Sequence, residues 1–301
     1  MNSPRASGAM EAWLDARSRM ASAAGGELRL RVLSAALLAP IALAAELAGS
    51  LPFGLLVMAV AVIAWREWAV MTGATKPLWA HVAVLICLAA GILALALGAR
   101  GWALGLLGAP TLLVLAAGLR NRAFLWMGLG LLYVAIPSAG LIMLRQAEPS
   151  GWAAVLFVLF IVWATDIAAY FGGRSFGGPK LWPRVSPKKT WSGALTGLAA
   201  ALGAGGLTAG LTGAGDWRLG VLIAAPLSVA SQLGDLLESA LKRRFGVKDS
   251  GRAIPGHGGV LDRLDGLFAA AALALLLAAS GAGGSILAMP RMNAAQIGAG
   301  P

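Results

Sequence analysis

The chain has 301 residues, of which 58% are hydrophobic and only 12% are charged, and its mean hydropathy is +0.78. This composition excludes a soluble globular domain and is typical of a protein that crosses a membrane several times. The formal net charge of +11 would suit a protein that binds nucleic acid, but the basic residues are distributed as expected for the loops of a membrane protein. We therefore expect no nucleic-acid partner.

The apolar runs predict nine membrane-spanning helices, because a helix needs about 20 mostly apolar residues to cross the hydrocarbon core. In chain order, the runs are 32–48, 51–71, 80–99, 101–118, 124–144, 152–171, 192–214, 217–238 and 260–279. No soluble domain of useful length interrupts them. We predict an all-α, polytopic integral membrane protein.

The predicted domain organisation has three parts. Residues 1–31 form a cytoplasmic tail, in which residues 10–20 are either an amphipathic surface helix or disordered. Residues 32–280 are expected to form a single transmembrane domain. Residues 281–301, rich in Gly and Ala, are expected to be a flexible tail.

The basic residues predict the orientation of the helices. With the N-terminus in the cytoplasm, only four of the 24 Lys and Arg residues fall outside, namely Arg100, Arg145, Arg218 and Arg291. Basic residues concentrate in cytoplasmic loops of membrane proteins. The distribution favours an N-in, C-out protein of the inner (plasma) membrane, with both long polar loops on the cytoplasmic side, where they can share one site.

The first of these loops begins within the sixth span and covers residues 166–190, DIAAYFGGRSFGGPKLWPRVSPKKT. An ionisable group such as Asp166 costs roughly 2.5–3.5 kcal/mol within a span, so it is either paired with a neighbouring helix or functional. Cations and hydroxyls suited to phosphate oxygens follow at the start of the next helix, where anions are favoured. These residues are Lys180, Ser186, Lys188, Lys189 and Thr190. For Lys180, positive-inside charge alone is the alternative.

A second group of polar residues lies near the end of the eighth span. Ser231, Asp235 and Glu238 occur at i, i+4 and i+7 and therefore share one helix face. Asp235 is deep in an apolar segment and is expected to be functional. Glu238 is nearer to the water, and we expect it to be a solvated charge at the helix end.

The third group covers residues 239–265 and holds nine charged residues in a chain that otherwise avoids charge. Its glycines, Gly258 and Gly259 among them, allow the backbone to approach a ligand closely. Asp262 and Asp265 lie in the first turns of the last span. Acids are favoured there by the helix dipole, which explains the presence of one acid but not of the whole charged loop. Carboxylates beside Lys and Arg suit Mg²⁺, which binds one or two acids and bridges substrate phosphates.

His257, in the same loop, is either an acid–base group or a residue that hydrogen-bonds the loop. The other histidine, His81, starts an apolar span, so a zinc site is not expected. Taken together, the residues indicate that a metal ion and a polyphosphate are handled at the inner face of a membrane. Transport of a phosphorylated anion fits the same residues, although the inverted halves typical of transporters are not evident.

The run S-x-L-K-R-x4-K-D-x-G-x2-I-P-x-H-G-G-V-x-D-R-L-D, from Ser239 to Asp265, resembles the signature of the phosphatidate cytidylyltransferase (CDP-diacylglycerol synthase) family. Two upstream groups are also similar to motifs of this family. They are Trp65, Glu67 and Trp68, and then Asp166, Tyr170, Gly173, Gly177, Lys180 and the run SPKKTW at 186–191. Ser192 departs from the family pattern, which commonly has Glu in SPKKTxEG.

The resemblance implies transfer of a cytidylyl group from CTP to phosphatidic acid, which gives CDP-diacylglycerol and pyrophosphate. It also implies Mg²⁺ as the cofactor, with one or two metal ions, and a homodimer. The phosphatidate phosphate would attack the α-phosphorus of CTP in line, so catalysis would rest on positioning and charge neutralisation. CTP-dependent activation of another lipid phosphate is the alternative within this chemistry, and a transporter of phosphorylated anions is the alternative outside it.

On this basis we assign three sets of site residues. The expected catalytic residues are Asp235, Lys248, His257, Asp262 and Asp265. The expected metal ligands are Asp235 and Asp262, with Asp166 and Asp265 in support. The residues expected to bind the substrates are Lys180, Ser186, Lys188, Lys189, Thr190, Lys242, Arg243, Gly258, Gly259 and Arg263.

Overall fold

The computed structural model describes residues 39–147, 150–213, 215–251, 253 and 258–287. A short helix, Ala39–Ala48, precedes the labelled elements. The long helices are α2 (Ser50–Thr72), α3 (Leu78–Ala96), α4 (Arg100–Gly118), α5 (Arg122–Arg145), α6 (Gly151–Phe176), α7 (Trp191–Thr212), α8 (Trp217–Arg244) and α9 (Leu261–Ala279). The strands β1 (Lys180–Trp182) and β2 (Ser186–Thr190) form an antiparallel hairpin between α6 and α7.

Within the described ranges, the seven helices from α2 to α8 are long and apolar enough to cross a membrane. The predicted all-α, polytopic class is therefore confirmed, apart from the small hairpin, which was not predicted. The count of nine spans and the orientation stay predictions. The first expected span is described only from residue 39 onward, and α9 carries Asp262, Arg263 and Asp265 in its opening turns.

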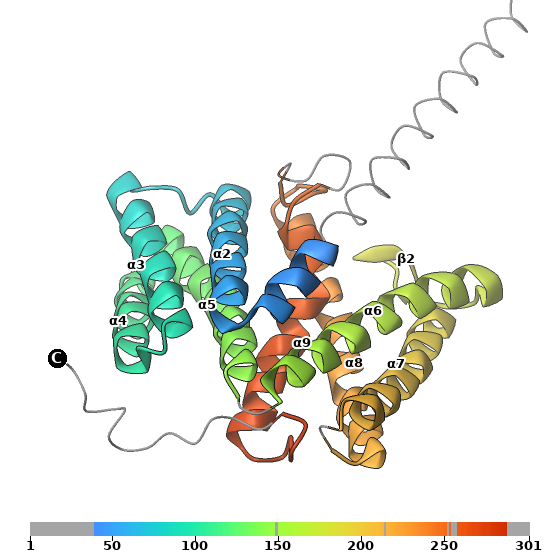
Figure 1. Ribbon diagram of the computed structural model, residues 1–301. Helices are drawn as coiled ribbons and strands as arrows, with labels where there is room; N and C mark the ends of the chain where they lie inside the picture. The colour runs from blue at the N-terminus through green and yellow to red at the C-terminus, as the bar shows by residue number, and fades with distance from the viewer. Residues whose placement is uncertain (1–38, 148–149, 214, 252, 254–257, 288–301) are drawn as a thin grey trace, which may run out of the picture.

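The helices form two groups on either side of α9 (Figure 1). Helices α2 to α5 make up one group, and α6, α7 and α8 make up the other. Helix α9 packs against both α5 and α8 and so joins the groups. This position brings the start of α9 close to residues from both halves of the chain.

Small residues allow the helices of the second group to approach closely. A side chain at Gly172 of α6 would overlap Thr196 of α7. A Cβ at Gly220 of α8 would lie 2.6 Å from the carbonyl oxygen of Gly205 in α7. Helices in lipid associate through such small-residue contacts, because burial of apolar surface gives little driving force there.

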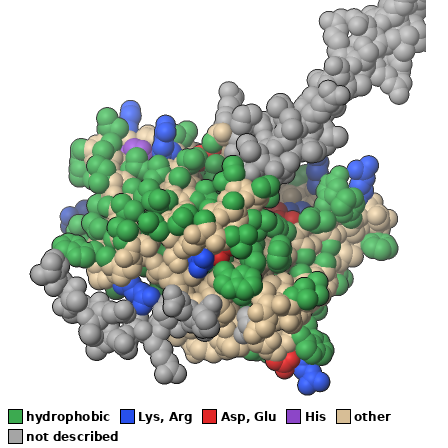
Figure 2. Space-filling model, viewed as in Figure 1, with side chains coloured by type: hydrophobic (Ala, Val, Ile, Leu, Met, Phe, Trp, Pro, Cys, Tyr) green, Lys and Arg blue, Asp and Glu red, His purple; other side chains and the backbone are tan. Residues whose placement is uncertain are grey.

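Apolar side chains cover much of the molecular surface, as Figure 2 shows for one face. Large side chains such as Leu104, Leu112 and Leu113 on α4 are exposed. A water-soluble protein rarely exposes apolar surface on this scale. The distribution agrees with helices that face lipid, so the protein is an integral membrane protein.

The two predicted tails differ in how much of them the structure describes. Residues 1–38, which include the predicted amphipathic segment, lie outside the described residues. Residues 281–287, expected to belong to a flexible tail, form turns, and Ile286 and Leu287 are buried in the core. The apolar side chains of Ile286 and Leu287 therefore anchor this part of the chain to the core.

Candidate active site

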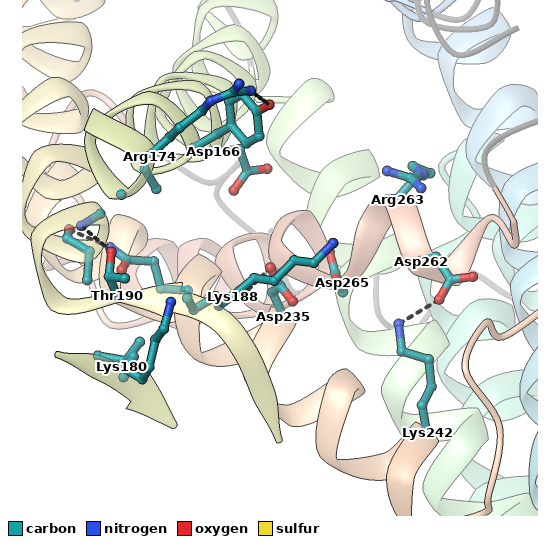
Figure 3. A pocket seen from close by; sticks show the side chains of 18 of the residues that line it. Asp166, Arg174, Lys180, Lys188, Thr190, Asp235, Lys242, Asp262, Arg263 and Asp265 are labelled. Carbon is teal, nitrogen blue, oxygen red and sulfur yellow. Dashed lines mark hydrogen bonds and ion pairs between the residues drawn. The ribbon is translucent and has the colours of Figure 1, made fainter. Parts of the chain in front are cut away.

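A cavity of about 910 Å³ lies among α6, the hairpin, α7, α8 and α9. Charged side chains of both signs line it, as Figure 3 shows. The acids are Asp166, Asp235, Asp249, Asp262 and Asp265. The cations are Arg174, Lys180, Lys188, Lys189, Lys242 and Arg263. The volume suits a ligand the size of a small organic molecule, and the charges suit a phosphorylated one.

The cavity brings together most of the residues that the sequence predicted. Ten of them line it, and they are Asp166, Lys180, Lys188, Lys189, Thr190, Asp235, Lys242, Asp262, Arg263 and Asp265. The lining does not include Ser186, Arg243, Lys248, Gly258 or Gly259. His257 lies outside the described residues. The two polar loops, residues 166–190 and 239–265, thus meet in one place.

The hairpin positions its cations at the start of α7. Its register pairs Lys180 with Thr190, so Lys180 and Lys188 stand on neighbouring strands. Thr190 is the N-cap of α7, and its hydroxyl accepts a hydrogen bond from the Gly193 N–H at 3.1 Å. The positive end of the α7 dipole and the hairpin lysines therefore point to the same cavity, which is favourable for an anion.

Ser192, the residue that departs from the family pattern, has a structural role in this loop. Its hydroxyl donates a hydrogen bond to the carbonyl oxygen of Gly177, just before the hairpin. It also lies 3.0 Å from the Thr190 hydroxyl. Ser192 thereby fastens the entry of the hairpin to the first turn of α7.

Asp166 and Asp235 face the cavity from α6 and α8 (Figure 3). Asp166 is solvent-exposed although it lies within a membrane helix, because the cavity reaches its side chain. Asp235 forms an ion pair with Lys189 of β2. Its carboxylate also accepts a longer hydrogen bond of 3.4 Å from Ser239, one turn along α8. The acid that the sequence singled out in the eighth span is thus tied to the hairpin.

Asp262, in the first turn of α9, is held on both oxygens. Its Oδ1 accepts a hydrogen bond from Lys242 Nζ at 2.6 Å. Its Oδ2 accepts hydrogen bonds from the backbone N–H groups of Ser250, at 2.9 Å, and Gly259, at 2.8 Å. Asp262 therefore joins α8, α9 and two positions in the loop between them, residues 250 and 259.

The expectation for Glu238 was wrong. Its side chain is only 1% exposed and forms an ion pair of 3.4 Å with Lys242. Helix α8 continues to Arg244, six residues beyond Glu238, and packs against α9. Position 238 is therefore inside the bundle, and its charge is neutralised by Lys242 and not by water.

The carboxylates that line the cavity fit a site for a divalent metal ion to which the substrate phosphates also contribute ligands. Among the residues that the structure describes, no three His, Cys, Asp or Glu side chains are close enough to form a protein cage for a metal. Mg²⁺ does not require such a cage, because one or two carboxylates, water and substrate phosphates complete its shell. The hard oxygen donors of Asp235 and Asp262, with Asp166 and Asp265 nearby in the lining of the same cavity, fit this kind of site.

Sequence reasoning did not assign four residues that matter here. Arg174, Gln232 and Asp249 line the cavity, and Glu67 of α2 contacts the loop before α9. Helical spacing could have identified two of them, since Arg174 follows Asp166 by two turns and Gln232 precedes Asp235 by one. Arg174 also donates a hydrogen bond of 3.1 Å to the Tyr170 hydroxyl.

Comparisons with known proteins point to one family. The model of the Cytidylyltransferase family matches residues 29–280. The chain is 42% identical to the phosphatidate cytidylyltransferase of Brucella suis over 259 residues, which cover 84% of this chain and 93% of that protein. It is 40% identical to the phosphatidate cytidylyltransferase of Pseudomonas aeruginosa over 277 residues, which cover 85% and 99% of the two chains.

Proposed function

The chain belongs to the cytidylyltransferase family, and from this we infer that it transfers a cytidylyl group from CTP to phosphatidic acid. The products are CDP-diacylglycerol and pyrophosphate. The chain is thus a membrane-bound nucleotidyltransferase of phospholipid biosynthesis. The observation that carries this function is the cavity, which combines phosphate-binding cations with a set of carboxylates at the ends of membrane helices.

The chemistry needs no protein nucleophile. An oxygen of the phosphatidate phosphate forms a bond to the α-phosphorus of CTP, and the bond from that phosphorus to the bridging oxygen of pyrophosphate breaks. The enzyme must hold two polyanions close together and in line. We propose that Lys180, Lys188 and Lys189, with the N-terminus of α7, bind phosphate oxygens on one side of the cavity. Lys242 and Arg263 bind phosphate oxygens on the other side. Arg243, Lys248 and Ser186 do not line the cavity, and they stay predicted substrate-binding residues.

We propose Asp235 and Asp262 as the carboxylates that hold Mg²⁺, with Asp166 and Asp265 in support. An ion held by these carboxylates would supply positive charge to neutralise the phosphates. Lys189 and Lys242, which pair with Asp235 and Asp262, keep the two acids neutralised when nucleotide is absent. Both lysines can then turn to the incoming phosphates, because a lysine is a flexible point charge.

We further propose that residues 32–280 form one catalytic membrane domain with nine spans, N-in and C-out, in the inner membrane. Most basic residues of the chain then lie on the cytoplasmic side, which supports a site facing the cytoplasm. A cytoplasmic site has direct access to CTP. The family resemblance supports a homodimer.

An assay of the purified protein tests this function. The full chain is reconstituted into vesicles that contain phosphatidic acid and is given radiolabelled CTP with and without Mg²⁺. We expect label in CDP-diacylglycerol only when Mg²⁺ is present, and no turnover by Asp262→Asn, although this variant elutes as a folded protein on size exclusion. Folded protein that forms no lipid-linked cytidylate with any divalent metal would contradict the function.

Two further measurements test the alternatives. Turnover with a panel of other lipid phosphates, compared with turnover of phosphatidic acid, tests the substrate. Uptake of CTP into the vesicles would indicate a transporter.

A further inference from the structure

Glu67 is a buried acid outside the cavity that the reaction described above does not use. It lies on α2, in the group formed by α2 to α5, and its side chain is 7% exposed. Its carboxylate points to the loop that connects α8 to α9. A buried carboxylate needs strong hydrogen-bond partners, and the partners of Glu67 come from the other half of the chain.

These partners are Ser250, within the loop, and Leu261, directly after it. Glu67 Oε2 accepts a hydrogen bond from the backbone N–H of Leu261, the first residue of α9, at 2.9 Å. It also accepts one from the Ser250 hydroxyl at 3.3 Å. One oxygen atom on α2 therefore connects residues 250 and 261, which are 183 and 194 positions away from Glu67 in the sequence.

Asp262 contacts the same loop, at Ser250 and at Gly259. Ser250 donates its backbone N–H to Asp262 and its hydroxyl to Glu67, so this single residue joins the two carboxylates. Leu261 and Asp262 are adjacent in the first turn of α9. A shift of Glu67 would consequently move the backbone that bears Asp262.

The fit around Glu67 is tight. A Cβ at Gly251 would overlap the Glu67 carboxylate. A Cβ at Gly259 would overlap the Ser250 hydroxyl and would lie 2.6 Å from Glu67 Oε2. The backbone on both sides of the loop is thus packed directly on this side chain, and a neighbour cannot fill the space of a shorter residue without moving the loop.

We propose that Glu67 is a positioning residue that fixes Asp262 for catalysis through Ser250 and the first turn of α9. The inference rests on the proposed cytidylyltransferase function. It gives α2, which has no residue in the cavity lining, a direct part in arranging the site. Displacement of a reacting group by about 1 Å can cost on the order of 100-fold in rate.

Three variants of the full-length protein test the proposal. Glu67→Ala removes the acceptor, Glu67→Asp keeps the charge but shortens the side chain, and Glu67→Gln keeps an oxygen that can accept both hydrogen bonds. We expect kcat to fall about 10- to 100-fold in the Ala and Asp variants, with a KM for CTP within about twofold of the wild type. We expect Gln to restore most of kcat, because the hydrogen bonds and not the charge position the loop.

Glu46→Ala is the matched control. Glu46 is also fully buried and forms a 2.8 Å ion pair with Arg145, but this pair ties helices far from the cavity. Its loss is expected to lower the thermal midpoint without lowering kcat per folded molecule. Equal loss of kcat in Glu46→Ala and Glu67→Ala would mean that general destabilisation is the cause, and would overturn the proposal.

Amide hydrogen exchange of the peptide that begins α9 is a readout that does not depend on activity. Exchange of this peptide is expected to rise in Glu67→Ala and Glu67→Asp and to stay at the wild-type level in Glu67→Gln and Glu46→Ala. If Glu67→Ala does not fold, Glu67→Asp decides: wild-type kcat together with wild-type exchange would overturn the proposal. If the wild type itself forms no CDP-diacylglycerol, the proposed function fails, while the exchange data still test the link between α2 and α9.

Discussion

Lys242 lies between two carboxylates from different helices. Its ammonium group is 3.4 Å from Glu238 on the same helix and 2.6 Å from Asp262 on α9, and its side chain is only 12% exposed. Glu238 is only 1% exposed, and Lys242 is the cation that pairs with it. Lys242 therefore has two separable functions, which are to neutralise a buried acid and to hold an acid of the cavity.

A double variant separates these functions. Lys242→Met leaves Glu238 as an uncompensated buried charge, so we expect a loss of stability of about 3 kcal/mol, together with a loss of turnover. In Lys242→Met/Glu238→Gln the buried charge is gone, and we expect the thermal midpoint to recover while turnover stays absent. The midpoint is measured in detergent and turnover in vesicles. Recovery of turnover in the double variant would show that Lys242 only neutralises Glu238.

The hairpin and the start of α7 act as one element. The hairpin is short, but it places Lys180 and Lys188 beside the N-terminus of α7, which is the positive end of the helix dipole. Ser192 fastens it through the hydrogen bond to Gly177. A glutamate, which the family pattern commonly has at this position, has no hydroxyl to donate in this way.

We expect Ser192→Ala to raise the KM for CTP about fivefold, because a hydrogen bond of this kind contributes about 1 kcal/mol. The expected change in kcat is smaller, since the acids of α8 and α9 stay in place. Ser175→Ala, an exposed serine of α6, is the control and should leave KM unchanged. Steady-state kinetics at saturating phosphatidic acid give both values, and a wild-type KM in Ser192→Ala would refute the role of the hydroxyl.

At the scale of the whole molecule, polar contacts lie at both ends of the bundle and the apolar core lies between them. Around the cavity, ion pairs connect α8 to the hairpin and to α9. Away from the cavity, Arg145 at the end of α5 pairs with Glu46, and Gln146 donates a hydrogen bond of 2.7 Å to the Leu95 carbonyl oxygen. Such pairing is expected where charged groups meet an apolar interior.

Labelling of single cysteines tests the orientation of the bundle. In a Cys87→Ser background, Ala253→Cys places a thiol in the loop before α9, and Arg218→Cys places one at the start of α8; both positions are exposed. We expect a membrane-impermeant maleimide to label Ala253→Cys only from the cytoplasmic side and Arg218→Cys only from the opposite side. Labelling of both from one side would contradict the predicted topology.

The amino-acid sequence by itself determined the membrane class and most of the cavity lining. Charge is costly in hydrocarbon, so the few charged residues near helix ends, such as Asp166, Asp235 and Asp262, stand out in an apolar chain. Helical spacing then placed several of them on common faces. These conclusions depend only on local sequence, which is why they did not need the structure.

Tertiary structure alone decided which of these charges are buried and what holds them. Glu238 is inside the bundle because α9 covers its helix face, and the same sequence at an uncovered helix end would be solvated. The contact between Glu67 and Leu261 joins residues 194 positions apart. No local pattern encodes such a contact, because it forms only when α9 packs between the two groups of helices and brings its first turn against α2.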